Sequence, residues 1–126
     1  MPEDRTRELA ADPDVHTLLA EDGDRLLAFT TLGPNRDDDS GPEVGEIRAF
    51  FADPGAWGGG AAPRLMAEAL PMLTDLGYRE VTLWSFASNG RANTFYERHG
   101  MRRDGAERTE EVWADEPQVR YRRPLA

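Results

Sequence analysis

The chain has 126 residues, of which 39% are hydrophobic and 31% charged, and this size predicts one domain spanning residues 1–126. It carries 24 acidic residues against 15 basic ones, and its formal net charge of −9 disfavours nucleic acid and anionic membranes as partners. Cysteine is absent and there are two histidines, so we expect no disulfide, no cysteine nucleophile and no metal site. No apolar run approaches the ~18 residues of a membrane span and no signal peptide follows Met1, which favours a cytoplasmic protein.

The first third of the chain predicts a helix, a hairpin and a loop. Residues 3–11 are helix formers with little apolar face, typical of a short solvated helix. Two apolar segments, 15–20 and 26–32, flank an Asp-Gly turn and predict a β-hairpin. Residues 33–43 contain Gly, Pro and three consecutive aspartates, and predict a loop.

The middle of the chain predicts a strand, a glycine-rich turn and a helix in succession. Residues 44–52 form the expected strand, and the turn occupies 55–60. Apolar side chains then recur at helical spacing over 65–76, and Gly77 stands where a left-handed C-terminal cap is expected.

The last third predicts a strand, a helix and two more strands. Residues 81–86 form the first strand, and Asn89 is a natural N-cap for a helix over roughly 90–99. A weaker strand pattern lies around 110–113 and a clearer one at 119–122. Together these elements predict a mixed α/β domain.

The most informative segment is the turn that joins the third strand to the first long helix. Its residues are Trp57, Gly58, Gly59, Gly60, Ala61, Ala62, Pro63 and Arg64. Glycines let several backbone N–H groups point inward, and a helix N-terminus adds its dipole, so this combination can bind a diphosphate without lysine. A tight connection that binds nothing explains the glycines equally well. A phosphate-loop NTPase is disfavoured because no Gly-Lys-Ser/Thr follows, and a Rossmann site because the turn comes after three strands.

Three linked segments carry a more specific signal. They are Glu46 to Ala62, which contains the turn; Gly77-Tyr-Arg-Glu-Val-Thr-Leu-Trp84; and Asn89-Gly-Arg-Ala-Asn-Thr-Phe-Tyr-Glu-Arg-His-Gly-Met101. In this order and spacing they resemble the GNAT (Gcn5-related N-acetyltransferase) superfamily over about residues 13–124. The resemblance implies an acyl-CoA N-acyltransferase fold, with a central mixed, mostly antiparallel sheet and helices on both faces. It also implies transfer of the acetyl group of acetyl-CoA to a primary amine of a small molecule or peptide.

The resemblance further implies where acetyl-CoA binds. The family pattern Arg/Gln-x-x-Gly-x-Gly/Ala places Trp57 first, Gly60 second and Ala62 third, although Trp57 is not polar and Pro63 lacks an N–H. Backbone groups of one strand would pair with the pantetheine arm as if it were an added strand, in a slot that opens after residue 52. The residues expected to bind acetyl-CoA are Phe50, Phe51, Ala52, Trp57, Gly58, Gly59, Gly60, Ala61, Ala62, Pro63, Arg64, Asn89 and Phe95.

Acetyl transfer needs a group that removes the proton of the amine and one that protonates the leaving thiolate. The resemblance implies that Tyr96, in Phe-Tyr-Glu-x-x-Gly, is the proton donor; the alternative is a tyrosine in the apolar stripe of its helix. Glu46 is a candidate general base through water, but an ion pair with Arg48 on the same strand face is equally expected. The aspartates at 37–39 either attract a cationic acceptor or are simply solvated.

Members of the family usually begin with a strand and one or two helices before the hairpin. We therefore expect an N-terminally truncated member with an unpaired sheet edge at 15–20. A second copy of the chain, giving a homodimer, or the helix at 3–11 is expected to cover this edge. The alternative function is that of a truncated, non-catalytic relative that binds CoA or only self-associates.

Overall fold

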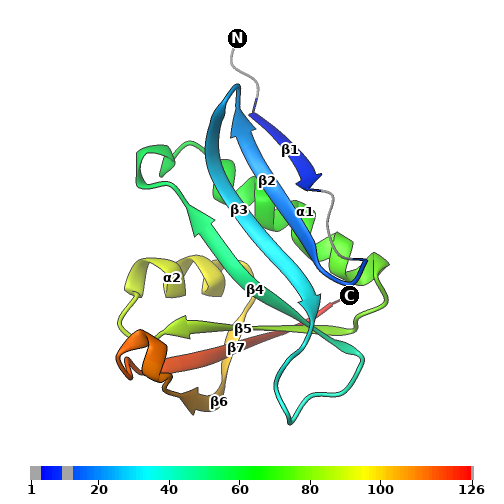
Figure 1. Cartoon of the computed structure of the whole chain (residues 1–126), viewed down its shortest axis with the longest axis vertical. Coiled ribbons are helices and arrows are strands. Elements are labelled where there is room, and N and C mark those ends of the chain that lie inside the picture. The colour runs from blue at the N-terminus through cyan, green and yellow to red at the C-terminus, as the bar shows by residue number, and fades with distance from the viewer. Residues whose placement is uncertain (1–3, 10–12, 126) are drawn as a thin grey trace.

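The computed structural model describes residues 4–9 and 13–125, which form one seven-stranded sheet and two α-helices (Figure 1). In chain order the elements are β1 (Asp4–Leu9), β2 (His16–Asp22), β3 (Arg25–Pro34), β4 (Val44–Ala52), the 3-10 helix η1 (Pro54–Ala56), α1 (Ala61–Asp75), β5 (Glu80–Phe86), α2 (Gly90–Arg98), β6 (Arg102–Arg108), the 3-10 helix η2 (Glu111–Trp113) and β7 (Gln118–Pro124). The strand order is β1-β2-β3-β4-β5-β7-β6, and among these neighbours only β4 and β5 run parallel. This confirms the predicted mixed, mostly antiparallel sheet.

The N-terminal segment is a strand, so the helix expected at 3–11 is wrong. β1 pairs antiparallel with β2 over its whole length, and Arg7 forms an ion pair with Glu21 across the two strands. Helix propensity in so short a segment is a weak preference, which sheet pairing overrides. β1 also occupies the edge at 15–20 that was expected to be unpaired, which removes the reason for expecting a second copy there.

The elements in the middle of the chain lie where the sequence predicts them. α1 starts at Ala61, a few residues earlier than expected, and its N-cap is Gly60 in the left-handed region. Its C-cap is Leu76, and the next residue, Gly77, has the positive φ (+99°) that favours glycine. Neither described helix has the length and apolarity needed to cross a membrane.

The C-terminal third contains a strand that the sequence analysis missed. β6 pairs with β7, whereas the strand expected around 110–113 is the 3-10 helix η2. Most side chains of β6 are exposed, so its sequence lacks the apolar alternation by which a strand is detected. Its register also shifts between Arg103 and Glu107, around Gly105 at φ +94°.

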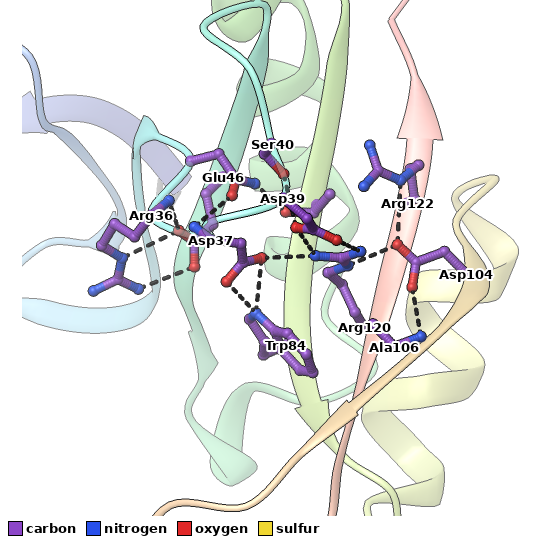
Figure 2. Close-up of polar contacts among 12 residues, drawn as sticks. Arg36, Asp37, Asp39, Ser40, Glu46, Trp84, Asp104, Ala106, Arg120 and Arg122 are labelled. Carbon is purple, nitrogen blue, oxygen red and sulfur yellow. Dashed lines mark hydrogen bonds and ion pairs between the residues drawn. The ribbon is translucent and has the colours of Figure 1, made fainter.

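Both helices pack on the same face of the sheet, which corrects the expectation of helices on both faces. Leu73 of α1 covers Gly45 of β4 so closely that a Cβ on Gly45 would lie 3.0 Å from it. Tyr96 of α2 packs on Tyr121 of β7, with ring centroids 6.0 Å apart. The pairing register and side-chain alternation place Gly45 and Tyr121 on one face. On the opposite face, the loop 35–43 lies over β4, β5 and β7 (Figure 2).

Apolar side chains of both helices and of the sheet form one core cluster. Its fully buried members include Leu32, Leu65, Met66, Leu73, Val81, Leu83, Met101 and Tyr121. α1 covers β2, β3 and β4, and Figure 1 shows it behind the first two. The core therefore fixes α1 on the face of the sheet formed by β2, β3 and β4.

Candidate functional site

β4 and β5 start side by side and then separate. Three cross-strand pairs join them, the last between Glu46 and Thr82, although β4 continues to Ala52 and β5 to Phe86. Figure 1 shows the two strands diverging, with α2 beside their open end. The separation expected after residue 52 thus starts earlier, after Glu46. A β-bulge leaves Arg48 without a partner on β3, and such bulges bend the strand that carries them.

The second half of β4 directs its backbone groups alternately to β3 and to the slot. The amide of Asp53 donates to a β3 carbonyl at 2.8 Å, and hydrogen-bonded and free pairs alternate along antiparallel strands. Phe51 therefore bonds to β3, which corrects its expected place on pantetheine. The N–H and C=O groups of Phe50 and Ala52 point into the slot. The carbonyl of Ala52 already accepts a hydrogen bond from Trp57 Nε1 at 3.2 Å.

The glycine turn leaves backbone donors without partners at the start of α1. Gly58 and Gly60 have φ values of +86° and +90°, which only glycine adopts readily. Three other amides, those of Trp57, Gly59 and Arg64, bond to carbonyls within the segment. The amides with no recorded hydrogen-bond partner among the described residues are those of Gly58, Gly60, Ala61 and Ala62. These donors lie at a helix N-terminus, where a phosphate group is stabilised by N–H groups and by the helix dipole.

Trp57, which occupies the polar position of the family pattern, links the turn to α2. The Arg91 guanidinium lies 3.7 Å from the centroid of its ring, in a cation–π contact. The indole remains 48% exposed. Pro63 and Arg64 are exposed in the first turn of α1, and Pro63 contributes no N–H. Trp57 therefore supports the shape of the turn.

Tyr96 lies on the face of α2 that meets the slot. Its side chain is buried, with ring centroids of Phe50 and Tyr121 at 6.3 and 6.0 Å. No described residue is recorded as a hydrogen-bond partner of its hydroxyl, and Tyr96 lines a cavity. Burial raises the pKa of Tyr96 to about 12, so the hydroxyl keeps its proton at neutral pH. The residue belongs to the apolar stripe and also lines the cavity, so its role as proton donor stays a prediction.

The start of α2 depends on two asparagines, one of which the sequence analysis missed. Asn89 is the N-cap, and its Oδ1 accepts a hydrogen bond from the amide of Ala92 at 3.3 Å. Asn93 is buried, accepts a hydrogen bond from Ser85 Oγ at 2.6 Å and donates to the carbonyls at 86 and 87. Asn93 thereby fixes α2 to the end of β5. The sequence feature that could have identified Asn93 is its position three residues before Tyr96, which places the two side chains on the same helix face.

Phe95 packs between α2 and β4. Its ring centroid lies 5.3 Å from that of Phe50 and 4.6 Å from that of His99. Phe95 thus helps to position the part of β4 whose backbone faces the slot.

Glu46 is buried in an ion pair with Arg36, so the ion pair expected with Arg48 is wrong. Its carboxylate accepts hydrogen bonds from the backbone N–H, Nε and Nη2 of Arg36 at 3.1, 3.1 and 3.0 Å. The bulge at Arg48 breaks the simple i, i+2 alternation on which the expected pair rested. Arg36 comes instead from the loop that folds over this face.

Two of the three consecutive aspartates are bound within the protein (Figure 2). Asp37 accepts hydrogen bonds from Trp84 Nε1 at 3.0 Å and from Arg120 at 3.2 Å. Asp39 accepts two from Arg120 at 2.8 Å, and these hydrogen bonds lower the pKa of Asp39 to about 2. Arg120 also binds Asp104 at 2.6 Å. The aspartates therefore fasten the loop 35–43 to the sheet, which corrects both expectations for Asp37 and Asp39; Asp38 is exposed.

A cavity of about 270 Å³ joins these features across the slot. Tyr96 and Asn89 line it together with Glu46. Its remaining walls are formed by Arg36, Arg48, Phe50, Trp84, Ser85, Phe86, Arg108, Glu110, Trp113 and Gln118. The structure thus brings together the two residues predicted to move protons. The amides of the glycine turn follow the C-terminal end of β4, whereas Glu46 lies near its start.

A larger hollow of about 520 Å³ lies between β1, β2 and the outer side of α1. Its walls include Glu8, His16, Glu68 and Pro71, none of which the sequence analysis assigned to a site. It contains none of the backbone donors or proton-transfer residues described above. The cavity at the slot is therefore the candidate site.

Comparison with known proteins places the chain in a family. Residues 1–101 match the family model described as "Acetyltransferase (GNAT) family". Over 86 residues the chain is 42% identical to a mycothiol acetyltransferase of Geodermatophilus obscurus, an alignment that covers 68% of this chain and 28% of that protein. The chain thus spans 28% of the length of this curated relative.

Solved structures share the fold at low sequence identity. An acetyltransferase of Bacillus subtilis in complex with CoA has a TM-score of 0.74 at 18% identity, covering 90% of this chain and 78% of that one. Nourseothricin acetyltransferase has a TM-score of 0.77 at 20% identity, covering 94% of this chain and 69% of that one. Because the family model matches residues 1–101 of the 126-residue chain, the chain belongs to the acetyltransferase (GNAT) family.

Proposed function

We propose that this chain is an acetyl-CoA-dependent N-acetyltransferase that acetylates the primary amine of a small molecule or peptide. The observation that carries the proposal is a set of amides with no recorded partner in the part of the chain that the structure describes. They are those of Gly58, Gly60, Ala61 and Ala62, and the slot along β4 opens nearby. Such donors suit the diphosphate of CoA. The relative named mycothiol acetyltransferase and the structural neighbour in complex with CoA support the same reading.

In this proposal the backbone of β4 holds the pantetheine arm. The N–H and C=O of Phe50 and the N–H of Ala52 supply the hydrogen bonds, as a sheet edge does for an added strand. The carbonyl of Ala52 is not needed, because Trp57 already binds it. Asn89, whose Oδ1 caps α2, has its Nδ2 left for the same arm. Holding the thioester and the amine together supplies most of the acceleration.

The chemistry requires two proton movements. The neutral amine attacks the thioester carbonyl, the C–N bond forms and the C–S bond breaks, and the thiolate leaves. Tyr96 donates its proton to the departing sulfur, a role consistent with a hydroxyl that stays protonated at neutral pH. The proton of the amine passes to water and from there toward Glu46. Arg36 occupies three hydrogen-bonding positions of that carboxylate, so we assign Glu46 a role through water and not by direct contact.

Thermal unfolding with and without acetyl-CoA tests binding. A ligand present at a hundred times its dissociation constant stabilises the folded chain by about 2.7 kcal/mol. Release of CoA over a panel of amines then tests turnover. Stabilisation without turnover of any amine would favour the non-catalytic relative, and no stabilisation would contradict the proposed function.

A further inference from the structure

The wall of the cavity on the helix-free face is basic, in a chain whose net charge is −9. We propose that the acceptor is a small amine that also carries a carboxylate, and that Arg48 binds this carboxylate. The inference rests on the proposed function and names the class of its acceptor.

Arg48 is placed by the bulge in β4. It lacks a partner on β3, and its side chain lies over Gly33, where a Cβ would come within 3.1 Å of the guanidinium. Its Nη2 donates to the carbonyl of Pro34 at 3.0 Å. The guanidinium is therefore held in one place at the wall of the cavity, and Gly33 leaves the space that it occupies.

The Nε of Arg48 is buried and has no hydrogen-bond partner among the described residues. A buried donor without an acceptor lowers stability, and a bound ligand atom is one way to satisfy it. Guanidinium presents parallel N–H groups that match the two oxygens of a carboxylate. Arg48 lines the cavity, so its unmet donor favours a ligand with an acceptor oxygen, and its positive charge favours an acidic one.

The other charges of the lining are already balanced. Arg36 binds Glu46, and Arg108 binds Glu110 at 3.2 Å and Gln118 at 2.9 Å. Each carboxylate of the cavity wall is thus paired with an arginine of its own, and Arg48 adds positive charge. The local charge is opposite to that of the whole chain, so composition alone would suggest the wrong acceptor.

The size of the cavity favours a small molecule. Its volume of about 270 Å³ lies just below the ~300–1,000 Å³ that is usual for small-ligand sites. Trp84, with Arg108 stacked 4.2 Å from its ring centroid, and the half-exposed Trp113 form apolar walls. An amino acid fits this cavity, because its carboxylate can contact Arg48 and its side chain can pack on the flat apolar walls.

NMR titration of the full chain with matched pairs tests the inference. The pairs are phenylalanine with phenylalaninamide and β-alanine with β-alaninamide, which differ only in the acidic group. We expect the acid of each pair to bind about tenfold more tightly than the amide and to shift the Nε–H signal of Arg48. Arg48→Gln should abolish the difference between acid and amide, whereas Arg102→Gln, an exposed arginine of β6, should preserve it.

Three results would overturn the inference: equal binding of acid and amide, no binding of either at millimolar concentration, and an equal loss of both in Arg48→Gln. Tighter binding of phosphoethanolamine than of β-alanine would also reject a carboxylate. Stabilisation by acetyl-CoA is measured separately. If acetyl-CoA stabilises the chain and acids and amides bind alike, the proposed function stands and this inference fails. If the acid binds selectively and acetyl-CoA has no effect, the proposed function fails, and Arg48 binds a carboxylate that is not an acetyl acceptor.

Discussion

The loop 35–43 leads into β4, and the glycine turn at 57–60 follows it. The two segments differ in whether their polar groups are hydrogen-bonded within the protein. In the loop, Asp37 and Asp39 are hydrogen-bonded to Trp84 and Arg120. In the turn, the amides at 58 and 60 have no recorded partner among the described residues. Polar groups satisfied within the protein stabilise the fold, whereas unsatisfied donors are suited to a ligand. The comparison predicts that changes in the loop affect stability and that changes around the slot affect binding or rate.

The largest expected effect is on the loop side. Arg120 is buried among Asp37, Asp39 and Asp104, so Arg120→Met leaves three carboxylates facing one another. We expect the free energy of unfolding, measured in urea, to fall by about 3 kcal/mol. Arg102→Met, at an exposed position of β6, should change it by less than about 0.5 kcal/mol. Equal effects of the two substitutions would show that the loop does not depend on Arg120.

Two buried tyrosines separate rate from stability. Tyr96→Phe removes a hydroxyl without a recorded protein partner, so we expect kcat to fall about a hundredfold with stability retained. Tyr121→Phe removes a hydroxyl that donates to Glu97 at 2.7 Å, and should cost about 1 kcal/mol of stability with kcat retained. If Tyr96→Phe binds acetyl-CoA and keeps its rate near neutral pH, the proton-donor role is lost while the fold stands.

Two glycines of positive φ test the turn. Gly60 (φ +90°) and Gly23 (φ +62°) both have open space where a Cβ would stand. Alanine at either position should destabilise the chain by about 1 kcal/mol, because L-residues disfavour this region. Only Gly60→Ala should weaken acetyl-CoA binding, by about tenfold in a calorimetric titration. Equal binding by the two variants would place the diphosphate elsewhere.

The smallest expected effect is a pH dependence at the loop. The pKa of Asp39 is lowered to about 2 by hydrogen bonds from Arg120, so its contribution to stability is present above its unfolded pKa of about 4. That contribution is lost as the pH falls from about 4 toward 2. As the pH falls through this window, the Asp39→Asn variant should therefore lose less stability than the Asp38→Asn variant. The second variant has the same charge change and keeps the contact between Asp39 and Arg120. The free energy of unfolding of both variants is measured in urea at several pH values. The same pH dependence in the two variants would contradict the assignment.

Much of the fold was predictable because its signals are local. The hairpin, the strand at 44–52, both helices and the glycine that follows α1 could be predicted from short-range patterns of apolar and turn residues. β1 and β6 were not predicted, since one contains helix formers and the other is mostly exposed. Both segments become strands because they pair with an adjacent strand, β2 or β7. The sequence within either segment does not show which strand will lie beside it.

The candidate site was predictable where it depends on backbone conformation or on a motif. The glycine turn and Tyr96 were found in this way. Arg36, Asn93 and Arg120 were not, because each gains its role from a residue distant in sequence: Arg36 from Glu46, for example, and Arg120 from Asp39. An isolated arginine or asparagine carries no signal of its eventual partner.

The sequence by itself determined which segments bend, which begin helices and which family the chain resembles, because glycine conformations, caps and apolar periodicity act within a few residues. Only the tertiary structure decided that both helices share one face, that the aspartates of the loop bind Arg120, and that Arg48 stands at the cavity wall. These features depend on strand register and on a single bulge in β4. A change of one residue in the register, or in the position of the bulge, would turn side chains of β4 to the opposite face of the sheet.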